Sequence, residues 1–175
     1  MNQERWQQIE SLYHSALELA AVIYTSLGRE RGSLWKVSTG GGEPLQLTHG
    51  AIMVRPVVSP DGNMIACNYR QDETDKWKIA VLPAGGGPPL KTFAFPYPYN
   101  QIIRWTPDSR ALIYLDKRDG VHNLWLQPLD GSLPAQLTNF TEDQLLHYAL
   151  PYTGAGFVLS RGGKRRDITI IRNFR

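Results

Sequence analysis

The spacing of apolar side chains changes once along the chain, near residue 20. Before that point they recur every three or four residues, which is the spacing of one face of an α-helix; they are Trp6, Ile9, Leu12, Tyr13, Ala16 and Leu19. After Ala21, short β-rich apolar runs alternate with clusters of Gly, Pro, Asn and Asp. The pattern therefore predicts one N-terminal amphipathic α-helix over 1–20 and an all-β region over 21–175.

The β-rich region repeats itself. Residues 21–48 align without a gap on residues 111–138, and 77–92 align midway between them. The identical pairs include Ala21 and Ala111, Ile23 and Ile113, Tyr24 and Tyr114, Trp35 and Trp125, and Thr48 and Thr138. A Ser/Thr-Pro-Asp marker recurs at 59–61 and 106–108. The repeating unit is therefore about 45 residues long, a period typical of propellers and other repeat architectures.

Each unit is predicted to contain four strands. In the second unit they cover 53–58, 64–69, 78–83 and 90–95, separated by a Pro-Asp turn, a polar hairpin and a glycine-rich turn. In the third unit the corresponding strands are 101–105, 111–116, 123–128 and 135–140, with a hairpin over 117–122. Four strands in such a period are typical of a β-propeller blade.

The predicted fold is thus a partial β-propeller, open or small, of four-stranded antiparallel blades with one N-terminal helix. The blades are placed at about 21–50, 51–95, 101–140 and 145–175. The first lacks its first strand and the last lacks its fourth. One blade buries its apolar face only against its neighbours, so Trp35, Trp105 and Trp125 are expected between blades.

The repeats at 21–175 resemble the TolB-like (WD40-like) propeller family, with its "SPDG…IA" and "LW…P…GG…QLT" motifs. The terminal "RRDITIIRNFR" resembles a closing strand of such propellers. Residues 4–19, "ERWQQIESLYHSALEL", instead resemble the start of bacterial serine/threonine kinases that carry a TolB-like propeller at their C-terminal end. In those kinases a catalytic domain, a membrane-crossing segment and several blades would separate the two parts.

No turn residue stands between the helical and β patterns in "LELAAVIYTSLG", residues 17–28. Two such elements usually meet through a few residues of turn chemistry. The sequence-based interpretation is a fusion of both ends of a longer protein whose middle is missing. A natural deletion, an error of sequence assembly and an engineered chain all fit this interpretation.

Composition adds few constraints. The net charge is +3, from 19 basic and 16 acidic residues, which argues against a dedicated nucleic-acid binder. The single Cys67 excludes an internal disulfide, and no apolar run reaches the length of a membrane helix. With no secretory signal, the chain as written is predicted to be cytoplasmic; the resemblance implies the periplasm for the propeller of full-length relatives.

Candidate chemistry is sparse, and no catalytic, cofactor-binding or metal-binding residue is assigned. Kinase motifs and a Gly-x-Ser-x-Gly elbow are absent from the sequence. The segments and side chains considered are the glycine run 39–44, the acidic hairpin 72–75, the basic hairpin 161–167, Ser160, and His14, His49, His122 and His147. Turns, a strand-end serine and histidines in separate elements without i, i+4 spacing explain them best, and Cys67 is expected to be a small buried residue.

The predicted function is therefore a non-enzymatic one. The chain is expected to bind a protein or a small ligand, of unknown identity, at its blade loops, without a cofactor. Two alternatives remain: a regulatory or sensor remnant of a serine/threonine kinase, and a substrate-gating propeller of a serine peptidase, each without its catalytic domain. Open blade edges and faces also predict self-association.

Overall fold

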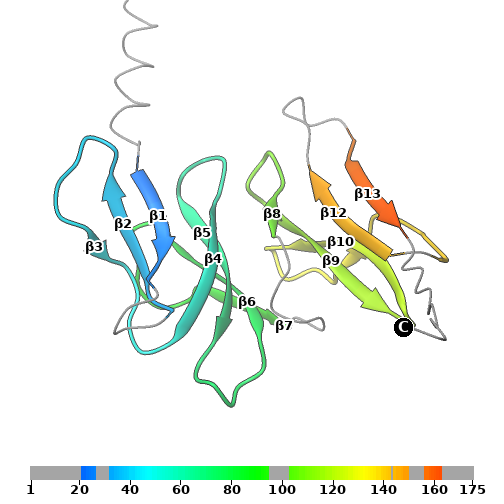
Figure 1. The fold of residues 1–175 in the computed structure, drawn as a ribbon, viewed down its shortest axis with the longest axis horizontal. Helices are drawn as coiled ribbons and strands as arrows, with labels where there is room; N and C mark the ends of the chain where they lie inside the picture. Colours follow the sequence, from blue (N-terminus) through cyan, green and yellow to red (C-terminus); the bar gives the residue numbers. More distant parts are fainter. Residues whose placement is uncertain (1–20, 27–31, 95–102, 143, 150–155, 163–175) are drawn as a thin grey trace, which may run out of the picture.

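The computed structural model describes residues 21–26, 32–94, 103–142, 144–149 and 156–162. Within these ranges every regular element is a β-strand, and the strands form four antiparallel sheets that follow one another along the chain (Figure 1). The predicted helix over 1–20 lies outside the described residues. The described residues include no helix that could span a membrane.

The first sheet has three strands, β1 (Ala21–Thr25), β2 (Leu34–Ser38) and β3 (Leu45–Gln46), in that order. The glycine run 39–44 forms the turn between β2 and β3, as its sequence predicts. Gly41 and Gly42 have φ angles of 91° and 109° there. Residues with a side chain rarely adopt such positive φ angles.

The second sheet has four strands, β4 (Ile52–Val58), β5 (Met64–Arg70), β6 (Lys78–Pro83) and β7 (Lys91–Ala94), in chain order. The Pro-Asp-Gly turn joins β4 to β5. In it the Asp61 carboxylate accepts hydrogen bonds from the Ser59 hydroxyl and the Asn63 amide. These bonds hold the pKa of Asp61 below its ordinary value, with the Ser59 bond the larger cause.

The third sheet repeats this arrangement with β8 (Arg104–Trp105), β9 (Ala111–Arg118), β10 (Val121–Pro128) and β11 (Ala135–Gln136). The hairpin expected over 117–122 is shorter than predicted, because β9 and β10 extend into it. Asp119 and Gly120 alone turn the chain, with φ angles of 50° and 86°. Two successive positive φ angles at Asp-Gly are typical of the tight type I′ hairpin.

The described part of the fourth sheet consists of β12 (Gln144–Ala149) and β13 (Val158–Gly162), whose register shifts between Leu145 and His147. Ser160 was expected at a strand end, and this expectation is wrong: it lies within β13, opposite His147. The rest of the segment assigned to the last blade lies outside the described residues.

Apolar clusters fill the space between successive sheets, so each middle sheet is buried on both faces. Leu34 packs with Ile65 and Leu82 between the first and second sheets. Between the second and third sheets the buried residues are Ala66, Ile79, Val81, Ile103, Trp105, Leu112, Tyr114 and Trp125. Between the third and fourth they are Ile113, Leu115, Leu124, Leu145 and Tyr148. This stacking of sheets is the packing expected of propeller blades, and the all-β prediction is confirmed.

Hydrogen bonds also join neighbouring sheets. The Trp105 indole Nε1 donates to the carbonyl oxygen of Val57 at 2.9 Å, linking the third sheet to the second. The Tyr148 hydroxyl donates to the carbonyl oxygen of Ile113 at 2.7 Å, linking the fourth sheet to the third. Aromatic side chains with a polar tip thus fix the relative position of adjacent sheets.

The three tryptophans expected between blades differ in burial. Trp105 and Trp125 are buried between the second and third sheets, as predicted. Trp35 is only half-buried, so for this residue the expectation is wrong. Its side of the first sheet has no described sheet against it. Cys67 is fully buried on β5, and burial raises the pKa of its thiol to about 12.

Candidate functional site

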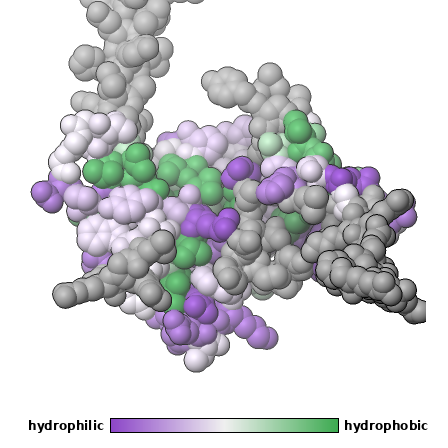
Figure 2. All heavy atoms as spheres, viewed as in Figure 1, coloured by the Kyte–Doolittle hydropathy of each residue, from purple (hydrophilic) through white to green (hydrophobic). Residues whose placement is uncertain are grey.

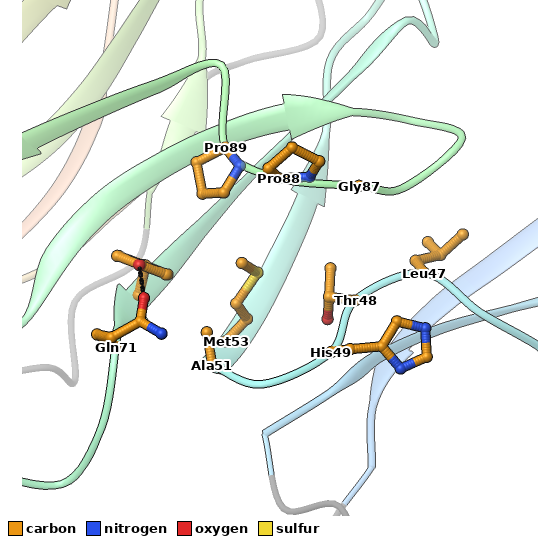
Figure 3. Close-up of a pocket in the computed structure, with 10 residues that line it drawn as sticks. Leu47, Thr48, His49, Ala51, Met53, Gln71, Gly87, Pro88 and Pro89 are labelled. Carbon is orange, nitrogen blue, oxygen red and sulfur yellow. Dashed lines mark hydrogen bonds between the residues drawn. The ribbon is translucent and has the colours of Figure 1, made fainter.

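A pocket of about 340 Å³ lies at the junction of the first and second sheets (Figure 3). Its walls come from the β3–β4 connection, the first part of β4, the end of β5 and the β6–β7 turn. The lining residues are Leu47, Thr48, His49, Ala51, Met53, Tyr69, Gln71, Gly87, Pro88 and Pro89. Residues up to 42 positions apart in the sequence therefore meet at one place.

The Gln-Leu-Thr motif shapes the β3–β4 wall. The Thr48 hydroxyl accepts a hydrogen bond from the Leu34 amide at 2.9 Å, and the Gln46 side chain donates to the Thr48 carbonyl at 3.0 Å. The third sheet repeats both bonds with Thr138, Leu124 and Gln136. The repeated motif is thus structural: it fastens the end of each outer strand to the strand beside it.

Glycine brings the β6–β7 turn against this wall. The Gly87 amide donates to the Leu47 carbonyl at 2.9 Å. A Cβ atom on Gly86 would lie 2.5 Å from that same carbonyl oxygen, and Gly86 has a φ of +90°. Glycine is therefore required at Gly86 for two reasons, its backbone conformation and the closeness of the two chains.

Tyr69 and Gln71 form the side of the pocket on β5. The Tyr69 hydroxyl donates to Gln71 Oε1 at 2.6 Å, and Gln71 Nε2 donates to the Gly50 carbonyl at 3.3 Å. In Figure 3, Gln71 lies on the side of the pocket opposite Leu47, and Pro88 and Pro89 lie across from Ala51.

A charged pair stands at the corresponding positions of the third sheet, 47 residues later. There Asp116 and Arg118 form an ion pair at 2.8 Å, and the Arg118 guanidinium lies 3.4 Å from the centre of the Trp125 ring. The second sheet has the neutral, hydrogen-bonded pair Tyr69 and Gln71 at the positions where the third sheet has this ion pair. Within the part of the chain that the structure describes, none of the pocket-lining residues is acidic, lysine or arginine.

Of the singled-out residues that the structure describes, His49 lines this pocket and the others lie elsewhere. The Asp72 carboxylate accepts bonds from Thr74 and Asp75 of its own hairpin. His122 is buried in β10, where burial, with a smaller effect of Lys117, lowers the pKa of its imidazole. Among the described residues no three His, Cys, Asp or Glu side chains gather closely enough to hold a metal ion.

The basic hairpin 161–167 is described only at its start. The Arg161 guanidinium lies 3.9 Å from the centre of the Phe140 ring and donates to the Glu142 carbonyl at 3.2 Å. The Arg161 side chain thus binds two residues of its own chain, Phe140 and Glu142. The other basic residues of the hairpin, and His14, lie outside the described residues.

Comparisons with known proteins find solved structures that resemble this chain. No protein-family model matches the chain. An uncharacterised protein of Agrobacterium fabrum (strain C58) is 30% identical over 105 residues, which are 59% of this chain and 32% of that protein. The match to the structure of TolB from Acinetobacter baumannii covers 71% of this chain and 32% of the TolB chain, at 18% sequence identity and a TM-score of 0.49.

The structure of a candidate TolB from Agrobacterium tumefaciens superposes on 67% of this chain with a TM-score of 0.52 and 26% identity. The described part of the chain has the fold of a TolB-like β-propeller segment. The chain spans 45% of that solved chain and about a third, 32%, of the curated relative. The TolB-like fold confirms the resemblance of 21–175. The kinase resemblance of 4–19 and the limits of the individual blades stay predictions.

Sequence reasoning did not find the pocket of the TolB-like segment. The Gln-Leu-Thr and glycine-rich motifs that form two of its walls are visible in the sequence, but as turns and repeats. The neutral pair Tyr69 and Gln71 carries no signature of its own. One usable signal was Pro88-Pro89, directly after a glycine run, because adjacent prolines form a rigid apolar surface.

Proposed function

We propose that this TolB-like segment is a non-catalytic binding module whose junction pocket takes an uncharged, apolar group, such as an apolar side chain of a protein partner. The observation that carries the proposal is the lining of the pocket. The described lining residues are mostly apolar, a few polar groups accompany them, and none of these described residues is acidic, lysine or arginine. Ligand sites usually combine an apolar lining with a few orienting polar groups.

The size and stiffness of the pocket support this role. Its volume of about 340 Å³ lies at the lower end of the usual range for ligand sites, roughly 300–1,000 Å³. It therefore suits one side chain or a small molecule better than a large cofactor. Met53 is buried at 2% exposure, and the rings of Pro88 and Pro89 have little freedom to lose, so binding requires little ordering of the walls.

The polar groups of the pocket would orient a bound ligand by hydrogen bonding. Gln71 Nε2 carries two N–H donors, of which the Gly50 carbonyl takes one at 3.3 Å. The second donor suits a carbonyl group of the ligand, such as the peptide carbonyl beside a bound side chain. His49 is exposed on the rim of the pocket and adds a further polar group.

The kinase-remnant and peptidase-gating roles remain alternatives based on the sequence resemblance. Each would use the same kind of binding surface inside a larger protein. No described residue favours either of them over a plain binding module.

N-acetyl-tryptophanamide is a suitable probe of the pocket, with N-acetyl-lysinamide as the charged control. We expect the tryptophan probe to shift the backbone amide signals of Gly50, Gln71 and Gly87 in a ¹H–¹⁵N correlation spectrum, with an affinity in the millimolar range. The lysine probe should leave these signals in place, because burying its charge without a partner is unfavourable.

Two variants keep this test specific. Ala51→Leu should reduce the affinity at least tenfold by filling the pocket, and Gln71→Ala should weaken it by removing the donor. Leu133→Ala is the matched control, because Leu133 is 87% exposed on the β10–β11 turn. Shifts scattered over all four sheets, or equal affinities for the two probes, would refute the proposed site.

A further inference from the structure

The junction between the second and third sheets carries an arginine, Arg118, with a chemistry different from that of the pocket. Arg118 ends β9 and stands at the position that Gln71 holds in the second sheet, 47 residues earlier. Alternate residues of a strand share one face. Arg118 therefore lies on the face of β9 that carries the buried Tyr114 toward the second sheet.

Two contacts hold the Arg118 guanidinium in place. Its Nε–H donates to Asp116 Oδ2 at 2.8 Å, and its carbon Cζ lies 3.4 Å from the centre of the Trp125 ring. The Asp116 side chain is fully buried, and Trp125 is only 9% exposed, so the surrounding core fixes both partners. The guanidinium is thus oriented before a ligand arrives, which reduces the entropy lost on binding.

The terminal nitrogens of Arg118 remain available. A guanidinium has five N–H donors, and the four on Nη1 and Nη2 have no acceptor among the described residues. Asp116 Oδ1 is buried and has no donor in the described part, so this carboxylate takes no second bond from the guanidinium. Asp119, the next acidic residue, forms none of the ion pairs found among the described residues. The Arg118 side chain is 51% exposed, so a ligand can reach it.

Two other arginines stack on aromatic rings in the described part, and both differ from Arg118. Arg70 lies over the ring of Trp77. Arg161 lies over the ring of Phe140. In both arginines a terminal nitrogen also donates to a backbone carbonyl of the chain, at 3.1 Å and 3.2 Å. Arg118 is stacked in the same way, but its terminal nitrogens are left for an acceptor from outside the described residues.

We propose that Arg118 binds a carboxylate, supplied by an acidic side chain of a protein partner. The two terminal nitrogens present a planar fork of N–H groups that matches the two oxygens of a carboxylate. The Arg118–Asp116 pair has no net charge, so it attracts a doubly charged phosphate little more than a carboxylate. The match in shape therefore favours the carboxylate. This site goes beyond the junction pocket, because it takes a charged group at a different junction.

The surface of the described part suits a protein partner of this kind. In Figure 2, hydrophilic and hydrophobic residues lie next to one another on the viewed face. A partner that covers such a surface has to match charged groups as well as apolar ones. An acidic side chain on Arg118 would contribute to the specificity of that contact.

Arginine side-chain ¹H–¹⁵N correlation spectra of the full chain test this proposal. We expect the α-amide of N-acetyl-glutamate to shift the guanidinium signals of Arg118, with an affinity in the millimolar range. N-acetyl-glutaminamide has the same shape without the charge and should leave these signals in place. Inorganic phosphate, at equal ionic strength, should bind more weakly than the glutamate probe. Equal shifts with the two amides, tighter binding of phosphate, or no shift of the Arg118 signals would overturn the proposal.

Arg118→Lys is the matching variant, because it keeps a positive charge beside the buried Asp116 carboxylate but lacks the fork. It should weaken binding of the glutamate probe by about tenfold. Arg110→Gln, which changes an exposed arginine of the β8–β9 turn, is the control and should leave the affinity unchanged. An Arg118→Lys variant that binds as tightly as the wild type would refute the fork. If this variant fails to fold, the comparison of the three probes on the wild type decides the proposal.

Discussion

Replacing Trp105 with alanine is expected to lower the free energy of unfolding by about 3–5 kcal/mol, the usual loss for a buried tryptophan. Trp105 is 4% exposed in the cluster between the second and third sheets. Its indole also donates to the Val57 carbonyl of the neighbouring sheet. The substitution thus removes packing and a hydrogen bond at one sheet junction. Urea unfolding followed by circular dichroism measures the change.

Trp77→Ala is the matched control for this prediction. Trp77 is half-buried, and the Arg70 guanidinium lies 4.7 Å from the centre of its ring, a contact worth about 1 kcal/mol at an exposed site. Trp105→Phe should fall between the two, because it keeps most of the packing but leaves the Val57 carbonyl without the indole. Equal losses for Trp105→Ala and Trp77→Ala would contradict the assignment of Trp105 to a sheet junction.

The second large effect is expected for Gly86→Ala. A side chain at a φ of +90° is strained by up to about 3 kcal/mol, and the added Cβ would lie 2.5 Å from the Leu47 carbonyl oxygen and 2.9 Å from the Leu47 Cα. Because both atoms belong to the backbone, the β6–β7 turn has to move away from the first sheet. The variant should unfold at markedly lower urea concentration and lose affinity for the apolar probe.

Gly85→Ala provides the control within the same turn. Apart from atoms of Gly85 and its two chain neighbours, no described atom lies within 4 Å of the Cβ position at Gly85, and its φ is not positive. This variant should therefore stay within about 0.5 kcal/mol of the wild type. A Gly86→Ala variant as stable as Gly85→Ala would show that the turn does not contact Leu47.

The β-strands could be predicted because each repeat carries its own markers. The strand expected at 78–83 matches β6 in both limits. The Ser/Thr-Pro-Asp marker locates the turns before β5 and β9, where Asp61 and Asp108 bond their own turns. These features depend on residues close together in the sequence, and the same chemistry is visible twice.

The remaining features depend on contacts between units. Tyr24 and Trp35 read like Tyr114 and Trp125 in the sequence, yet they differ in burial because only the second pair has a described sheet against it. The pocket depends on Tyr69 and Gln71 standing where the next unit has a charged pair. Such differences between copies are weak in a single sequence, since a repeat is recognised by what its copies share.

The account rests on the stacking of successive sheets as propeller blades, and the Trp105 indole proton reports on it most directly. Its hydrogen bond joins Trp105 to Val57, 48 residues earlier. We predict nuclear Overhauser effects between this proton and protons of Val57 and Val58, together with slow exchange of the proton with solvent. An indole proton that exchanges rapidly and shows contacts only to residues next to Trp105 in the sequence would contradict the stacked arrangement.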